Sequence, residues 1–127
     1  MFKAIIIAGT LLFAAPAPAL AQHAHSAQKG PNGGPMEDVA GVHVELVVSG
    51  QAVAVNVFDE AGKPLDANGY SGSAQVTAGT DRKTFALTPA GTALTAQAPA
   101  AIPSGAAITL VIKTAAGKSG QAKFSAP

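Results

Sequence analysis

Three histidines and one carboxylate carry most of the coordination chemistry that this sequence offers. His23 and His25 form an H-x-H pair, and His43 and Glu45 stand two residues apart in an alternating segment. Residues two apart on an extended chain project to the same side, so each pair can present both side chains to one ion. Imidazole and carboxylate ligands suit Cu(II), Zn(II) or Ni(II). We therefore expect a divalent transition metal to bind where the N-terminal segment folds back, joining His23 or His25 to His43 and Glu45.

A plainer interpretation of the same residues stays open. An H-x-H pair in a terminal segment can bind first-row metals adventitiously, since short histidine tracts are compositional evidence only. His43 can simply pack on Phe58 at a half-exposed strand face. Glu45 can form an ordinary solvated cross-strand pair with Asn56. In this interpretation the strand residues have structural roles and metal binding is adventitious.

The element expected to position the second pair is a hairpin over residues 42–58. Aliphatic residues alternate with other residues in both halves, VHVELVVS and AVAVNVF, which is the period of a β-strand. A two-residue loop at Gly50 and Gln51 pairs every inward aliphatic residue with another, whereas a one-residue slip would separate them all. Glycine at the first loop position favours a type II′ turn. The register also sets the pairs of the outer face, namely His43 with Phe58, Glu45 with Asn56 and Val47 with Ala54.

The first 21 residues have the pattern of an export signal. Lys3 precedes an apolar run, AIIIAGTLLFAA, and the small residues Ala19 and Ala21 occupy the −3 and −1 positions of a cleavage site. The run is too short for a permanent transmembrane helix, so we expect no membrane anchor. Cleavage after Ala21 would release a periplasmic or secreted protein. The expected parts are a signal peptide (1–21), a flexible segment containing Gly, Pro and His (22–41) and a folded β-domain (42–127).

The amino-acid composition argues against several classes of function. Without Lys3, seven lysines and arginines balance seven aspartates and glutamates, so no basic surface is expected for binding nucleic acid. Cysteine is absent, which excludes disulfides and thiol chemistry. A Ser–His–Asp set can be written from His43, Asp59 and one of several serines, but no G-x-S-x-G motif marks a nucleophile. Glycine-rich phosphate loops are also absent. We expect no enzymatic activity.

Short strands with turn signals continue to the C-terminus. Alternating apolar residues predict strands over 73–78, 83–88, 92–97 and 108–113, followed by a last strand that contains Phe124. The expected pairs are Val76 with Phe85, Ala74 with Leu87, Leu87 with Leu94, Phe85 with Ala96, Leu110 with Ala122 and Ile108 with Phe124. Proline and glycine interrupt the alanine-rich stretches, so no helix is expected in the mature domain. About seven short antiparallel strands predict an all-β fold, an immunoglobulin-like β-sandwich, with a small barrel as the alternative.

Two stretches resemble known families. Residues 29–48, KGPNGGPMEDVAGVHVELVV, resemble the GP[NH]GG motif and following strand of periplasmic adaptor proteins of heavy-metal efflux pumps, and small exported proteins that share this opening. A histidine commonly precedes GP in the adaptors, where this chain has Lys29, and the long helical hairpin of an adaptor is absent. Residues 56–78 are similar to the strand–turn–strand pattern of bacterial immunoglobulin-like domains, including the FixH/YtkA-like group. The first resemblance implies a role beside metal efflux, and the second supports the fold.

The leading hypothesis from the sequence is a periplasmic, non-enzymatic protein that binds or buffers a divalent transition metal in association with metal efflux. The alternative is a structural or interaction module that docks another envelope protein through an exposed strand edge or through the Phe58 face. Removal of the residues before Gly30 separates the two hypotheses. Metal affinity would collapse in the first case, whereas partner binding would survive in the second.

Overall fold

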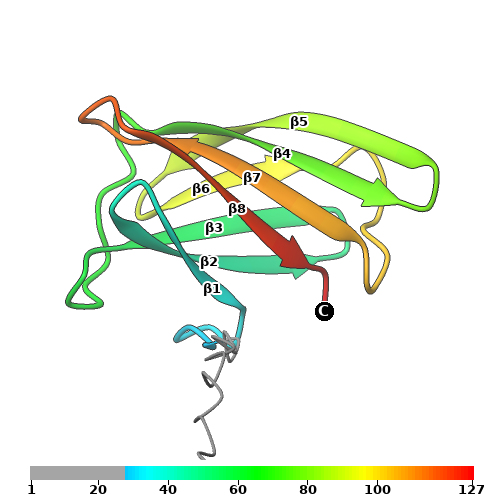
Figure 1. The fold of residues 1–127 in the computed structure, drawn as a ribbon, viewed down its shortest axis with the longest axis horizontal. Coiled ribbons are helices and arrows are strands. Elements are labelled where there is room, and N and C mark those ends of the chain that lie inside the picture. The colour runs from blue at the N-terminus through cyan, green and yellow to red at the C-terminus, as the bar shows by residue number, and fades with distance from the viewer. Residues whose placement is uncertain (1–27) are drawn as a thin grey trace, which may run out of the picture.

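Antiparallel strands make up the fold (Figure 1). The structure, a computed structural model, describes residues 28–127, which contain eight strands and no helix. In chain order these are β1 (Met36–Val39), β2 (Val42–Ser49), β3 (Ala52–Phe58), β4 (Ser71–Ala78), β5 (Asp81–Ala90), β6 (Ala93–Gln97), β7 (Ala107–Lys113) and β8 (Ser119–Ser125). The all-β prediction is confirmed. The predicted signal peptide, with its cleavage site, lies outside the described residues.

The expected count of seven strands is wrong by one, because β1 was not foreseen. Residues 36–39 fall in the segment that was expected to precede the folded domain. Here they pair with β2, from Met36 opposite Glu45 to Val39 opposite Val42. The two strands are joined by Ala40 and Gly41, both with positive φ (51° and 85°), as a tight hairpin turn of this length requires. The sheet therefore begins ahead of the central hairpin.

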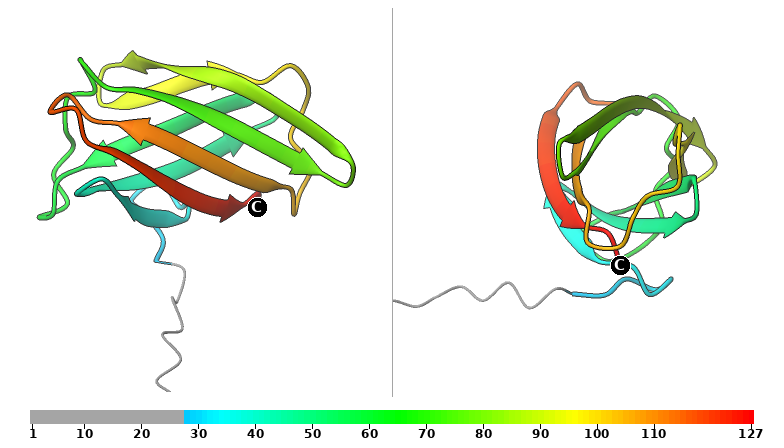
Figure 2. Two further views of the ribbon diagram at one scale, coloured as in Figure 1. Left: turned by 45° about the horizontal axis from the view of Figure 1, so that its top comes forward. Right: turned by 90° about the vertical axis from the view of Figure 1, so that its right-hand side faces the viewer.

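All eight strands belong to one sheet, in the order β1-β2-β3-β6-β5-β4-β7-β8. Seen end-on, the sheet curls until β1 and β8 lie side by side, so its shape is nearly that of a barrel (Figure 2). β5 joins the two halves of the sheet, because residues 81–87 pair with β4 and residues 88–90 pair with β6. Pro89 lies in the second part, beyond the pairing with β4, where a residue without an N–H group is tolerated.

Close packing brings the first and last strands of the sheet together. A Cβ atom on Gly120 of β8 would lie 2.8 Å from the backbone nitrogen of Ala40 and 3.0 Å from Cγ1 of Val39. Val39 and Phe124 are buried in the cluster that fills the interior. Glycine at position 120 therefore lets the two strands approach more closely than any larger residue would allow.

The interior is filled by the inward-facing aliphatic residues of both halves of the sheet. The largest of those with almost no exposure are Val44, Leu46, Val55, Val57, Leu94, Ile108, Leu110 and Ile112. They alternate along their strands with outward residues, which is why the period-two pattern of the sequence identified them. Removal of this apolar surface from water is the main stabilising contribution that a chain without disulfides has available.

The central hairpin has the register that the sequence predicted. All expected pairs between β2 and β3 are present, including those between His43 and Phe58 and between Glu45 and Asn56. The turn lies at Gly50, with a φ of 60°, and Gln51. The hairpin of β7 and β8 also agrees, with Leu110 opposite Ala122. The first register was predicted from matching aliphatic residues on facing strands. The second was predicted from a three-residue loop that ends at Gly117, whose φ is 85°.

Two other registers are wrong by two residues. The observed pairs are Val76 with Lys83, Ala74 with Phe85 and Leu94 with Pro89. Both hairpins have a two-residue loop that begins at a glycine with positive φ, Gly79 or Gly91. The expected turns were a four-residue loop over 79–82 and a turn through Ala90 and Gly91. A shift of two residues keeps every side chain on its face of the sheet. The shift therefore changes the predicted partners but not the predicted inner face of these strands.

Candidate functional site

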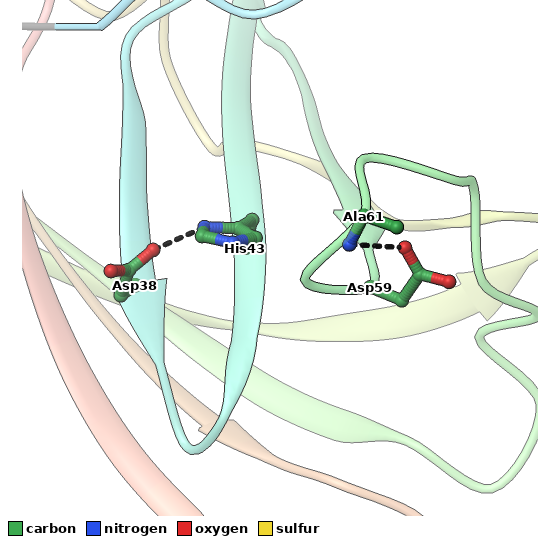
Figure 3. Close-up of polar contacts among 4 residues, drawn as sticks. All are labelled: Asp38, His43, Asp59 and Ala61. Atoms are coloured by element: carbon green, nitrogen blue, oxygen red, sulfur yellow. Dashed lines mark hydrogen bonds and ion pairs between the residues drawn. The ribbon is translucent and has the colours of Figure 1, made fainter.

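His43 lies on the outer face of β2, in a cross-strand row with Asp38 of β1 and Phe58 of β3. Its Nδ1 atom contacts Oδ1 of Asp38, and the two side chains point toward one another from neighbouring strands (Figure 3). The imidazole is 32% exposed and the carboxylate 79% exposed. When the hydrogen lies on Nδ1, that N–H group donates a hydrogen bond to the carboxylate of Asp38, and the lone pair of Nε2 is left to coordinate a metal ion. Metal-binding histidines are commonly held by a carboxylate in this way.

Two shallow grooves meet at His43, with volumes of about 250 and 240 Å³. Glu60, on the turn that follows β3, lines both of them. Met36 of β1 and Gln28, the first described residue, line the second groove. The surroundings of the imidazole therefore include one carboxylate in contact with it, a second carboxylate nearby and one thioether.

Asp59 shapes the turn that carries Glu60. Its Oδ1 accepts a hydrogen bond from the backbone N–H of Ala61 (Figure 3) and another from that of Lys63, both at 2.9 Å. The carboxylate partner of His43 is Asp38 rather than Asp59. The Ser–His–Asp set that can be written on paper with Asp59 is therefore not the pairing that this imidazole makes.

Glu45 has surroundings that neither sequence-based interpretation foresaw. The residue is completely buried on the outer side of β2, beneath the residues that precede β1. Its Oε2 accepts hydrogen bonds from the backbone N–H groups of Asn32 (2.8 Å) and Gly34 (3.0 Å). Its Oε1 accepts from the side-chain amides of Asn32 (2.8 Å) and Asn56 (3.4 Å). The pair with Asn56 is present, but it is enclosed rather than solvated.

The residues that cover Glu45 form the N-terminal loop, defined here as residues 28–35. The N–H of Gly30 donates to the carbonyl of Gly34, and the N–H of Gly33, where φ is 82°, donates to the carbonyl of Gly30. The loop is joined to the sheet by a hydrogen bond from Leu46 N–H to the carbonyl of Pro35. The GPNGG motif is thus a tight reversal that rests on β2.

Two glycines of the motif are required by close approach. A Cβ on Gly30 would lie 2.4 Å from Cδ of Glu45, and a Cβ on Gly34 would lie 2.1 Å from the backbone oxygen of Leu46. Neither position has room for a side chain. The same closeness is what allows the backbone N–H of Gly34 to reach the buried carboxylate.

Of the four ligands predicted from the sequence, two lie among the described residues. His43 is half-buried and accessible, whereas both oxygens of the Glu45 carboxylate already accept hydrogen bonds. His23 and His25 lie outside the described residues. Within residues 28–127 no group of three or more His, Asp or Glu side chains is placed to hold a metal ion. A coordination shell around His43 would need further ligands from the preceding residues or from solvent.

Sequence reasoning missed Asp38 and Glu60 as neighbours of His43. Asp38 was missed because residues 36–39 were not recognised as a strand. The signal that could have found it is the pair Ala40–Gly41 between two valines, since glycine in a two-residue loop is typical of a hairpin. No comparable pattern in the sequence indicates that the turn after β3 brings Glu60 to the same groove.

No protein-family model matches the chain, and comparisons with curated proteins and with solved structures give no match either. Between residues 28 and 127 there is no helix with the length and hydropathy needed to cross a membrane.

Proposed function

We propose that the chain is a non-enzymatic binding protein that binds a divalent transition metal ion, Cu(II), Zn(II) or Ni(II), at His43. The contact between His43 Nδ1 and Asp38 Oδ1 is the observation that carries this proposal. A carboxylate on Nδ1 fixes the orientation of the ring and increases the basicity of the other nitrogen, which strengthens a metal bond through Nε2. Asp38 is largely exposed and Glu60 lines the adjoining grooves, so both add negative charge where a cation would bind.

The remaining protein ligands in this proposal are His23 and His25. Gln28 lines the same groove as His43, and His25 precedes Gln28 by three residues. Three residues of chain span at most about 11 Å, which is long enough to bring an imidazole to the groove. Glu45 is left out of the ligand set, because a metal ion would have to displace the four donors that its carboxylate accepts.

The cellular setting of the proposal comes from the sequence. The predicted signal peptide would direct the protein to the periplasm or out of the cell, and the resemblance of residues 29–48 to metal-efflux adaptors is the basis for a buffering role beside an efflux system. We also propose the finer assignment of an immunoglobulin-like sandwich. It is supported by two groups of antiparallel strands that share only β5.

A metal titration followed by NMR tests the proposal. In the protein that starts at Gln22, the ring signals of His43 should shift together with those of His23 and His25 at micromolar Zn(II) or Ni(II). His43→Ala should weaken binding about tenfold or more, whereas the control Gln121→Ala, at an exposed position of β8, should leave it unchanged. A response confined to His23 and His25 at millimolar metal would refute the proposed site.

A second candidate function is docking of another envelope protein through a strand edge. Residues 81–87 of β5 pair with β4 alone, so their other edge has no strand partner within residues 28–127. A groove of about 110 Å³, lined in part by Phe85 and Ile102, lies beside it and could take apolar side chains of an added strand. Phe58, the other expected docking surface, is buried. A photo-crosslinker at Lys83 should then capture a defined partner in cells, and one at Lys123 of β8 should not.

A further inference from the structure

The free edge of β5 carries main-chain hydrogen-bonding groups that no strand between residues 28 and 127 uses. A two-residue loop joins β4 to β5, so Ala78 and Asp81 beside the loop form a hydrogen-bonded pair. Every second residue of β5, counted from Asp81, therefore points its N–H and C=O groups toward β4. The residues between them point these groups the other way, where pairing with β6 begins only at Thr88. These free positions are Arg82, Thr84 and Ala86.

The same edge is open to another chain. The turn between β4 and β5 extends beyond the ends of the other strands (Figures 1 and 2). Five of the first six residues of β5 are exposed, and only Phe85 is half-buried. An added strand would thus meet free N–H and C=O groups at alternate residues, which is how an extended peptide joins the edge of a sheet.

An apolar groove lies along the inner side of this edge. It has a volume of about 110 Å³ and is lined by Phe85 and Lys83 of β5 and by Ala98 and Ile102 of the segment that follows β6, among others. Residues directly opposite each other on antiparallel strands have their side chains on the same face of the sheet. An apolar side chain opposite Phe85 on an added strand would therefore lie over the groove.

The charges of the edge indicate the kind of strand that fits it. Arg82 and Lys83 are exposed on opposite faces of β5, and neither forms an ion pair with a residue between 28 and 127. Asp81, at the turn, is the one carboxylate of residues 81–87. A second copy of this edge would bring the two cations of each copy together, and like charges on neighbouring strands are destabilising. Charge complementarity therefore favours a partner strand that carries carboxylates.

We propose that residues 81–87 accept an extended acidic segment of another protein as an additional antiparallel strand. In the partner, an apolar residue opposite Phe85 is followed two and three residues later by carboxylates opposite Lys83 and Arg82. The main-chain groups of the edge supply affinity, and the groove and the two cations supply specificity. This inference rests on the docking function given above as the second candidate and names the chemistry of its partner.

A peptide titration followed by NMR tests this partner chemistry on the protein that starts at Gln22. The probe is the end-blocked peptide TVTEET, which places valine opposite Phe85 and two glutamates opposite Lys83 and Arg82. It should shift the amide signals of Arg82, Thr84 and Ala86 in a saturable way. The matched peptide TVTKKT should bind at least tenfold more weakly, because its lysines face the cations of the edge.

Thr84→Pro removes the central N–H of the free edge and leaves the pairing with β4 in place, since proline is tolerated where the N–H faces solvent. It should weaken TVTEET binding at least tenfold, whereas Thr84→Ala, which keeps the N–H, should bind as the parent does. Unchanged binding by Thr84→Pro would overturn strand addition at this edge. Equal binding of the two peptides would overturn the acidic partner.

Two further outcomes separate this inference from the docking function on which it rests. If neither peptide binds while the photo-crosslinker at Lys83 captures a partner in cells, the acidic strand is refuted and the docking function stands. If the protein alone associates with rising concentration and the same three amide signals shift, the occupant is a second copy of this chain, and the proposed partner is wrong.

Discussion

The substitution Gly34→Ala tests most directly how the N-terminal loop is held on the sheet. The Cβ atom would lie 2.1 Å from the backbone oxygen of Leu46 and 3.2 Å from Cγ of Glu45. Non-bonded heavy atoms are most favourably placed at about 3.5–4.0 Å, so a displacement of roughly 1 Å or more is needed. Leu46 is held in the sheet by its pairing with Val55 of β3, and its other edge faces only the loop, through the hydrogen bond to Pro35. The loop has to move because the sheet cannot.

The contacts that such a movement breaks give the size of the effect. The hydrogen bond from Gly34 N–H to Glu45 Oε2 is lost, and the one from Leu46 N–H to the carbonyl of Pro35 is weakened. A bond to a charged group contributes about 1.5–3 kcal/mol and a neutral one about 1 kcal/mol. We therefore expect Gly34→Ala to lower the free energy of unfolding by about 2–4 kcal/mol. That is a large fraction of the ~5–15 kcal/mol typical of a domain.

Gly33→Ala is the matched control in the same loop. Gly33 has a φ of 82°, and an added Cβ would meet nothing within 4 Å. Its cost is limited to left-handed backbone strain, about 1–2 kcal/mol, and the loop should stay attached. Urea unfolding followed by circular dichroism gives the free energies, and hydrogen exchange reports the amides of Asn32 and Met36. The reasoning is refuted if the two variants lose the same stability and both keep those amides protected.

Two further predictions concern the closure of the sheet and its interior. Gly120→Ala should lower the free energy of unfolding by about 1–3 kcal/mol in the same urea assay, because its Cβ would lie 2.8 Å from the backbone nitrogen of Ala40. An unchanged unfolding midpoint would mean that the first and last strands are not packed as described. Leu110→Ala, in a fully buried position, should cost about 2–5 kcal/mol. Val111→Ala, at the neighbouring position that is 45% exposed, should change the free energy of unfolding by no more than about 0.5 kcal/mol. Equal losses of stability for Leu110→Ala and Val111→Ala would contradict the assigned inner face.

The sequence predicts the strands better than it predicts their partners. In the central hairpin, aliphatic residues on both strands allow only one register that buries them together, and the structure has it. In the hairpin of β4 and β5, a shift of two residues buries the same face, so the apolar pattern cannot choose between registers. The register is set instead by the two-residue turn that begins at Gly79, where φ is positive. A rule that starts two-residue loops at glycine would have corrected this register and that of β5 with β6.

The burial of Glu45 could not be predicted from the sequence pattern of its strand. The period of two correctly placed it on the outer face with His43, and an outer face is usually solvated. Its burial comes from the N-terminal loop, whose residues 32 and 34 donate to it from thirteen and eleven residues earlier in the chain. Only the three-dimensional arrangement reveals that two backbone N–H groups and two amide side chains meet at one carboxylate. The sequence contains the partners but not the distances among them.

This geometry also changes what the GPNGG motif implies. Gly30 and Gly34 are explained by the space they leave for Glu45 and Leu46, and Asn32 by the two hydrogen bonds that it donates. In this chain the glycine-rich turn and the glutamate of the following strand are therefore a packing unit, whether or not the protein binds metal. The proposed metal binding therefore depends on the residues that this packing leaves unexplained. These are the imidazole of His43, with its free nitrogen directed away from Asp38, and the two histidines that precede the loop.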